Sequence, residues 1–162
     1  MAHPEKLGKY QVTGVLGEGA MGVVYKGFDP GIGRAVALKT IRHSLAGPEH
    51  TAALAARFRN EAQAAGRLSH PGIVAVYDFG DGADVAYIAM EFVEGRSLAS
   101  YLTAKVRFTD TDIVGIMSQL LDALGHAHEK GVWHRDVKPA NIILMANGRL
   151  KVADFEIGRA HV

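Results

Sequence analysis

A short polar segment around residue 136 carries side chains of three chemical kinds. Asp136, Lys138 and Asn141 bring a carboxylate, an ammonium group and an amide within six residues. A carboxylate can accept a proton from a hydroxyl, an ammonium group can neutralise a transferring phosphate, and an amide oxygen can ligate a hard cation. Asp154 follows a predicted strand and is a second candidate cation ligand. The alternative interpretation is a polar surface loop, with Asp154 as an ordinary turn residue.

A glycine-rich segment near the start of the chain is a candidate phosphate site. Gly17, Gly19 and Gly22 form a G-x-G-x-x-G pattern. A dinucleotide site needs a helix directly after such glycines, whereas Val23-Val24-Tyr25 predicts a strand. The chain also lacks the Gly-Lys-Ser/Thr triplet of a Walker A loop. A glycine turn between two strands can still bring backbone N–H groups close to phosphate, and a turn without a ligand is the alternative.

Two charged residues fall within apolar patterns. Strand alternation places Lys39 on the same face as Ala37 and Ile41, and Glu61 lies in line with the apolar stripe of a predicted helix. A buried charge without a partner costs several kcal/mol, so an ion pair between Lys39 and Glu61 would satisfy both residues. The alternative is that each charged group extends to water at the rim of its element.

Histidines near residue 130 do not indicate a metal site. His126 and His128 are two positions apart on a predicted helix, and such residues do not share a face. We therefore expect these residues and His134 to pack or to cap rather than to ligate a metal.

Composition excludes several classes of protein. The 162 residues contain 18 Lys and Arg against 17 Asp and Glu, a net charge of +1, which gives no electrostatic footprint for nucleic acid or an anionic membrane. The absence of cysteine excludes disulfides and thiol catalysis. No apolar run approaches the roughly 20 residues that span a bilayer, and the N-terminus has no apolar signal region. We expect a cytoplasmic protein.

The elements that must position these side chains change in type along the chain. Period-2 patterns and turns predict strands at 10–16, 23–25, 35–41, 73–79 and 85–93, with one helix at 49–68 between the third and fourth. Helices are predicted at about 96–104 and 110–130, the second with Thr109 as N-cap and Gly131 after its end. Strands at 142–145 and 149–153 meet at an Asn-Gly turn. This order predicts an α+β protein of two lobes.

The order of these motifs resembles a eukaryotic-like Ser/Thr protein kinase of the bacterial kind. The resemblance covers about Tyr10 to Arg159. It rests on LGEGAMGVVYKG (16–27), VALK (36–39), RFRNEAQAAGRLSHPGIVAVYD (57–78), MEFVEG (90–95) and HRDVKPANIIL (134–144). It implies a tail at 1–9 and an N-lobe at 10–93, with a five-stranded sheet and the helix at 49–68. A partial C-lobe at 94–162 would hold a catalytic loop at 132–141.

The same resemblance implies a role for each site residue. Asp136 would orient the substrate hydroxyl and accept its proton, Lys138 would neutralise the γ-phosphate of ATP, and Asn141 and Asp154 would hold Mg²⁺. Lys39, paired with Glu61, would hold the α- and β-phosphates. The implied nucleotide contacts are Leu16, Gly17, Glu18, Gly19, Ala20, Met21, Gly22, Val24, Ala37, Lys39, Met90, Glu91, Val93, Ser97 and Ile143. Within this set Val24, Ala37 and Ile143 would enclose the adenine ring, Met90 would be the gatekeeper, and the backbone of Glu91 and Val93 would contact the adenine edge. Ser97 would contact the ribose.

The sequence departs from the kinase pattern in two places. The family's Asp-Phe-Gly motif is Asp154-Phe155-Glu156 here, and the chain stops at Val162, before the activation segment and the later helices. Leu120, Leu121 and Leu124 are therefore expected to lack a covering partner, which would favour self-association or a partner chain that covers the incomplete lobe.

Two functional hypotheses follow. The first is a Ser/Thr kinase region that uses ATP and Mg²⁺ and phosphorylates a protein Ser or Thr. The second is a truncated, catalytically impaired, pseudokinase-like module that binds a nucleotide or a partner, for which Glu156 and the missing activation segment are the indications.

Overall fold

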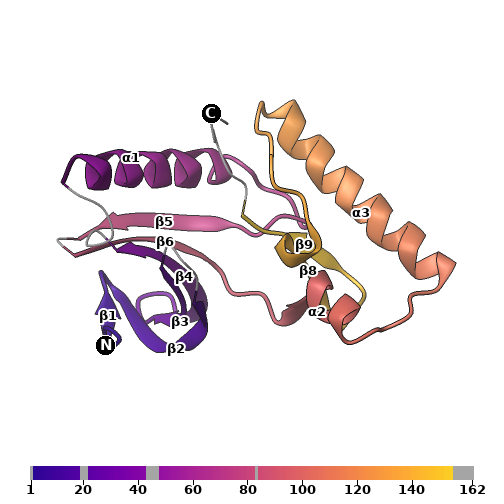
Figure 1. Ribbon diagram of the computed structural model, residues 1–162, viewed down its shortest axis with the longest axis horizontal. Coiled ribbons are helices and arrows are strands. Elements are labelled where there is room, and N and C mark those ends of the chain that lie inside the picture. The colour runs from indigo at the N-terminus through magenta and orange to yellow at the C-terminus, as the bar shows by residue number, and fades with distance from the viewer. Residues whose placement is uncertain (1, 19–21, 43–47, 83, 155–162) are drawn as a thin grey trace. The chain divides into compact units, whose positions relative to one another are not determined.

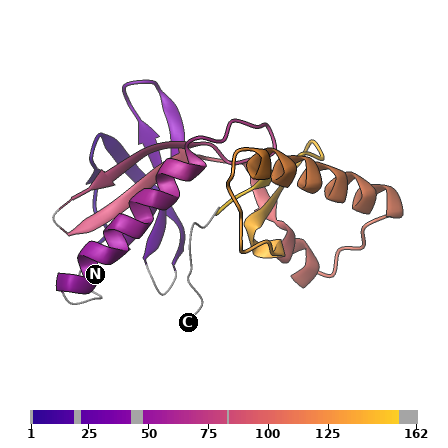
Figure 2. The same cartoon turned by 90° about the horizontal axis from the view of Figure 1, so that it is seen from above.

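The computed structural model describes residues 2–18, 22–42, 48–82 and 84–154. The chain forms two compact units (Figures 1 and 2). The first contains residues 1–66 and 76–92, and the second contains residues 67–75 and 93–162. The segment 67–75, which the sequence analysis grouped with the first lobe, thus folds with the second unit.

An antiparallel sheet of six strands forms most of the first unit, in the order β1-β2-β3-β4-β6-β5. Its strands are β1 (Lys6–Leu7), β2 (Tyr10–Glu18), β3 (Val23–Asp29), β4 (Arg34–Arg42), β5 (Val76–Asp81) and β6 (Val85–Glu91). The predicted sheet had five strands, and β1 is the addition. It forms within the expected tail because Leu7 is buried in the core beside Tyr10 and pairs with it.

The turn between β3 and β4 is held by a buried carboxylate. Asp29 is 2% exposed, and its Oδ1 accepts the N–H of Gly31 at 2.9 Å. Lys9 places its Nζ 3.8 Å from Asp29 Oδ2 and supplies the countercharge. The carbonyl of Asp29 accepts the N–H of Gly33, whose φ of 77° suits glycine. This turn fixes the register in which Val24 faces Lys39.

Helix α1 (Pro48–Ala65) covers one face of the sheet. Its Phe58 and Ala62 pack against Ile41, Ala86 and Ile88. Figure 1 shows α1 lying along β5 and β6. The helix was predicted to run to residue 68, but it ends at Ala65, before Gly66. The opposite face of the sheet holds a second core cluster, built on Leu7, Tyr10, Val23, Tyr25, Val36, Leu38, Tyr87 and Ala89.

The second unit combines helices with a small antiparallel sheet. Its helices are α2 (Leu98–Thr103), α3 (Asp110–Glu129) and the 3₁₀ helix η2 (Pro139–Asn141). The sheet has the order β7 (Gly95–Ser97), β8 (Ile142–Met145) and β9 (Leu150–Val152). Figure 2 shows α3 beside this sheet, which the helix contacts at β9.

Helix α3 begins at the predicted cap. The Thr109 side chain accepts the N–H of Asp112 at 3.1 Å, and Asp112 Oδ2 accepts the N–H of Thr109 at 3.1 Å, which completes a capping box. After the helix, Gly131 has φ 75°. The prediction of both helix ends is therefore confirmed to within one residue.

The apolar stripe of α3 is only partly buried. Leu120, Ala123 and Ala127 are the buried residues. The expectation that Leu120 is uncovered was wrong, because this side chain faces the unit's own core and is 7% exposed. Leu121 is 63% exposed, as expected, and Leu124 is half-buried. The small alanines let the helix approach the strands closely, and hydrophobicity alone did not indicate that face.

The β8–β9 hairpin is tied to α3 by one side chain. Gln119 donates from Nε2 to the carbonyl of Gly148 at 3.1 Å, and its Oε1 accepts the N–H of Leu150 at 3.1 Å. Gly148, in the predicted Asn-Gly turn, has φ 80°. No sequence pattern pointed to Gln119, which fixes the hairpin that precedes Asp154.

Candidate functional site

The loop between α3 and β8 is anchored by a buried histidine. His134 is 1% exposed, and its Nδ1 accepts the backbone N–H of Asp136 at 3.1 Å. The proton must then reside on Nε2, which donates to the carbonyl of Ala153 at 2.6 Å. His134 therefore shapes the loop and ties it to the residue before Asp154.

Two residues of this region hold a left-handed backbone. Arg135 has φ 65° and Asp154 has φ 57°, a region that non-glycine residues seldom adopt. Such conformations persist only where surrounding contacts enforce them, and they concentrate at functional sites. Both positions adjoin residues that His134 binds.

The Asp136 carboxylate lies between two donors. Lys138 Nζ is 3.2 Å from Oδ2, and Asn141 Nδ2 donates to the backbone carbonyl at 2.9 Å and to Oδ2 at 3.4 Å. The hydrogen bond from Lys138 is the main cause that lowers the pKa of Asp136, and the Asn141 contact adds to it. Asp136 is therefore ionised at neutral pH and offers oxygen acceptors to a hydroxyl. The predicted trio of Asp136, Lys138 and Asn141 is in mutual contact.

Asn141 is suited to hold a hard cation through oxygen. It is 7% exposed in η2, and its Nδ2 donates to Asp136, which leaves Oδ1 as the side-chain atom that could ligate a cation. Its backbone carbonyl accepts the N–H of Ala153 at 2.9 Å, which places Asn141 beside the residue that precedes Asp154. An amide and a carboxylate oxygen fit Mg²⁺, which keeps several waters and takes few protein ligands. Within the described ranges, no group of three or more His, Asp or Glu could hold a metal ion.

The glycine segment joins β2 and β3, as its strand-forming neighbours predicted. Gly17 pairs with Val24, and a Cβ at Gly17 would meet nothing within 4 Å. A Cβ at Gly22 would collide with the backbone carbonyl of Thr40. Gly22 is thus required by the fold itself, whereas Gly17 is not. Gly19, Ala20 and Met21 lie outside the described residues.

Lys39 and Glu61 come from two surfaces that face each other in the first unit. Alternation along β4 puts Lys39 on the face of Ile41, which packs against α1, and Glu61 is adjacent to the buried Ala62 of α1. Both side chains are partly buried. The ion pair between them stays a prediction that this arrangement favours.

The remaining predicted nucleotide contacts are divided between the units. In the first unit Ala37 pairs with Met90 and Val36 with Glu91, while Leu16 and Glu18 are exposed on β2. In the second unit Ser97 pairs with Ile143, and Val93 is half-buried. The Ser97 hydroxyl accepts the N–H of Ser100 at 3.1 Å and so caps α2, a role that the sequence analysis did not foresee.

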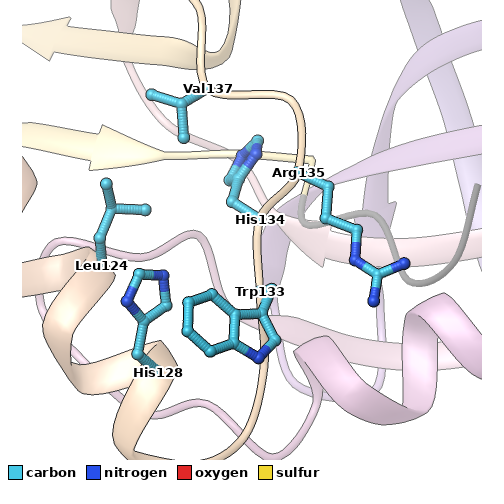
Figure 3. Close-up of a pocket in the computed structure, with 6 residues that line it drawn as sticks. All are labelled: Leu124, His128, Trp133, His134, Arg135 and Val137. Carbon is cyan, nitrogen blue, oxygen red and sulfur yellow. The ribbon is translucent and has the colours of Figure 1, made fainter.

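A surface hollow of about 440 Å³ lies in the second unit, against the loop at 132–141. Leu124, His128, Trp133, His134, Arg135 and Val137 line it (Figure 3). The rings of His128 and Trp133 lie side by side with centroids 4.2 Å apart, and Arg135 extends away from them. Trp133 is 56% exposed, so this apolar wall is open to solvent.

Comparison with protein families matches residues 10–161 to the protein kinase domain. The chain belongs to the protein kinase family. Its α+β architecture is accordingly kinase-like, as predicted. Bacterial serine/threonine-protein kinases are among its relatives. A probable serine/threonine-protein kinase of Streptomyces coelicolor is 43% identical over 99% of this chain, and serine/threonine-protein kinase PrkC of Bacillus subtilis is 42% identical over 94%. The chain spans 24% and 23% of the length of these two kinases. None of the helices in the described part of this kinase chain is long and apolar enough to cross a membrane.

Proposed function

We propose that this chain is the ATP-binding and catalytic-loop portion of a Ser/Thr protein kinase, which transfers the γ-phosphate of ATP to a protein Ser or Thr hydroxyl. The observation that carries the proposal is the contact set around Asp136, which joins a carboxylate, an ammonium group and an amide in one loop. The first unit then corresponds to the N-lobe and the second to the start of the C-lobe. Names of relatives support the choice of Ser/Thr substrates.

Residues of the second unit would act on the hydroxyl and the metal. Asp136, held ionised by Lys138, accepts a hydrogen bond from the hydroxyl and then its proton. Lys138 is close enough to Asp136 to neutralise charge on the transferred phosphate as the hydroxyl attacks. Asn141 and Asp154 would hold Mg²⁺, which supplies positive charge to the phosphate oxygens.

Residues of the first unit would hold the nucleotide. Backbone N–H groups of the glycine segment at 17–22 would contact the phosphates, and Lys39 would do so with Glu61 as its partner. Ala37, Met90 and the edge of β6 at Glu91 would form one side of the adenine site. The Lys138-Pro139 form of the loop is typical of Ser/Thr rather than tyrosine kinases.

A second candidate function rests on one departure from the family pattern. Glu156, outside the described residues, replaces the glycine that follows Asp-Phe in the family. The added carboxylate and the less flexible backbone would act next to Asp154, whose φ is already left-handed. A nucleotide-binding module without transfer activity is the alternative.

The test combines nucleotide binding with phosphoryl transfer from radiolabelled ATP to a mixed Ser/Thr peptide substrate. We expect the unmodified chain to bind Mg-ATP, Lys39→Met to weaken that binding, and Asp136→Asn to abolish transfer while binding persists. Lys6→Met removes an exposed lysine of β1 and is the control. Binding without transfer in the unmodified chain, unchanged in Glu156→Gly, would favour the binding module. Absence of Mg-ATP binding would refute both functions.

A further inference from the structure

The segment that connects the end of α1 to β5 contains a histidine with two engaged ring nitrogens. His70 Nε2 lies 3.0 Å from Asp122 Oδ2 of α3, and His70 Nδ1 accepts the N–H of Gly72 at 2.9 Å. Because Nδ1 is the acceptor, the proton resides on Nε2 and is donated to the Asp122 carboxylate. The His70 side chain is 15% exposed, so it is enclosed, whereas Asp122 is open to solvent.

The ring of His70 is also packed against α3. Its centroid lies 5.1 Å from that of His126, one helical turn after Asp122. Gly72 is equally close to α3, since a Cβ on it would meet Ala123 Cβ at 3.3 Å and His70 Nδ1 at 3.2 Å. The tight turn that starts at His70 is closed by the N–H of Ile73, which donates to the carbonyl of His70 at 3.1 Å. His70 therefore fastens this turn to one face of α3.

The same turn also pairs with the small sheet, along the outer edge of β9. The N–H of Val152 donates to the carbonyl of Gly72 at 2.8 Å, and the N–H of Val74 donates to the carbonyl of Val152 at 3.0 Å. Ile73 and Val152 thus form a parallel bridge at the outer side of β9. Val152 is fully buried and lies two residues before Asp154.

The backbone just before Asp154 is therefore held by two separate sets of hydrogen bonds. Ala153 is held from the catalytic loop by His134 Nε2 and by the carbonyl of Asn141. Val152 is held from the turn at residues 70–74, which His70 and Asp122 attach to α3. Loss of the second attachment would let β9 shift against the loop and would displace the Asp154 carboxylate relative to Asn141.

We propose that His70 and Asp122 are positioning residues for Asp154: their hydrogen bond fixes the turn at 70–74, and the turn fixes β9. This inference rests on the proposed function only for its consequence, the placement of a metal-binding carboxylate. The hydrogen-bond path itself is independent of whether the chain transfers phosphate.

Four variants of the full chain separate the parts of this path. Asp122→Ala removes the acceptor, whereas Asp122→Asn keeps an oxygen that can accept from His70 Nε2. His70→Asn retains an acceptor for the Gly72 N–H, as Asn does in turns, but cannot reach Asp122. Glu129→Ala removes a carboxylate of α3 that makes no hydrogen bond or ion pair with the described residues, and it is the control.

Amide hydrogen exchange measured by NMR reports the path directly. We expect exchange at Val74 and Val152 to accelerate roughly threefold to thirtyfold in Asp122→Ala and in His70→Asn, the range for residues that act through a network. The double variant should add little, because both changes break one link. Asp122→Asn should restore slow exchange. The Ile113 amide, bonded to Thr109 at the other end of α3, should not change in any variant.

Binding of Mn²⁺ in the presence of ATP, followed by water proton relaxation, is the second measurement. Asp122→Ala should weaken Mn²⁺ binding by a similar factor and Asp122→Asn should restore it. Unchanged exchange at Val74 and Val152, equal acceleration at Ile113, or the same effect in Glu129→Ala would overturn the inference, as would faster exchange with unaltered Mn²⁺ binding. If the unmodified chain binds no Mg-ATP, the proposed function fails and the exchange data alone decide the hydrogen-bond path.

Discussion

The protonation state of Asp136 is set by its neighbours in the loop rather than by burial. Lys138 donates to Oδ2 and Asn141 donates to the same oxygen and to the backbone carbonyl. These contacts favour the ionised form and lower the pKa of Asp136. A carboxylate with a low pKa is a weak base, so under the proposed function Asp136 would contribute mainly by orienting the hydroxyl before the proton moves.

Replacement of Lys138 should therefore raise the pKa of Asp136. In Lys138→Met the largest cause of the lowered value is lost, and we expect the pKa to move up toward the ordinary value of 3.8. The measurement is a ¹³C NMR titration of the Asp136 carboxyl carbon. Lys130→Met, which removes an exposed lysine after α3, should leave that titration unchanged. An equal titration in wild type and Lys138→Met would contradict the role given to Lys138.

The sign of the effect on stability follows from the lowered pKa. Asp136 has a lower pKa in the folded than in the unfolded chain, so its contribution is present above the unfolded pKa and is lost as pH falls through the folded pKa. Since this carboxylate is open to solvent, the contribution is small. Acid sensitivity of catalysis, rather than of folding, should reveal the Lys138 contact.

Gly17 and Gly22 offer a test of phosphate binding that is separate from folding. Gly17→Ala adds a methyl group into open space, so we expect thermal stability to change little and Mg-ATP binding to weaken, because the methyl group obstructs approach of the phosphate. Gly22→Ala should destabilise the first unit, since its Cβ would collide with the Thr40 carbonyl. Isothermal calorimetry and thermal denaturation distinguish the two. Normal nucleotide affinity in Gly17→Ala would count against the phosphate role of this turn.

Helix α3 depends on its capping box because several of its apolar residues are exposed. Thr109→Ala removes the acceptor for the Asp112 N–H and should destabilise the second unit by about 1 kcal/mol. For a chain of this size, that corresponds to a fall in Tm of about 2–4 °C. Thr111→Ala, at an exposed position within the first turns, should not lower Tm, because Ala has the higher helix propensity. Equal Tm values for the two variants would show that the cap contributes nothing.

At the level of elements, sequence patterns predicted features set by neighbouring residues and missed contacts between residues far apart in the chain. The Thr109 cap, the Asn-Gly turn and the strand after Gly22 follow from short-range backbone preferences, and all three are present. The bridge between Ile73 and Val152 joins residues far apart in the chain and has no periodic signal. Gln119 was missed for the same reason, since one amide on an exposed-looking helix face gives no indication that a distant hairpin needs it.

At the site, closeness in the sequence allowed contacts to be predicted, whereas contacts that depend on the folded surroundings of a side chain were missed. The contacts of Asp136, Lys138 and Asn141 could be predicted because all three lie in one short loop. The positioning roles of His134 and His70 could not, since each depends on which ring nitrogen faces which backbone group after folding. No sequence pattern assigned a contact to His70, in the segment that follows α1. In the structure the His70 side chain contacts Asp122 of α3.

For the whole molecule, the exposed apolar surface on α3 is the feature that bears on association between chains. Val114, Met117 and Leu121 are spaced to lie on one face of the helix and are 68%, 45% and 63% exposed. Contiguous exposed apolar side chains of this kind favour association. We expect the isolated 162-residue chain to self-associate through this face, in a concentration-dependent way that sedimentation velocity detects.

Leu121→Glu tests this expectation without disturbing the core. Since Leu121 is largely exposed, the substitution should change folding stability by less than about 0.5 kcal/mol. A leucine buried at an interface contributes about 1.5–3 kcal/mol, so its replacement by a charge should weaken association by about tenfold or more. Ile32→Glu places the same charge at a side chain that is 65% exposed in the first unit, in the turn between β3 and β4, and should leave association unchanged. A wild-type chain that stays monomeric at all concentrations would show that there is no self-association to explain. An equal loss of association in Ile32→Glu would show that association does not depend on the exposed face of α3.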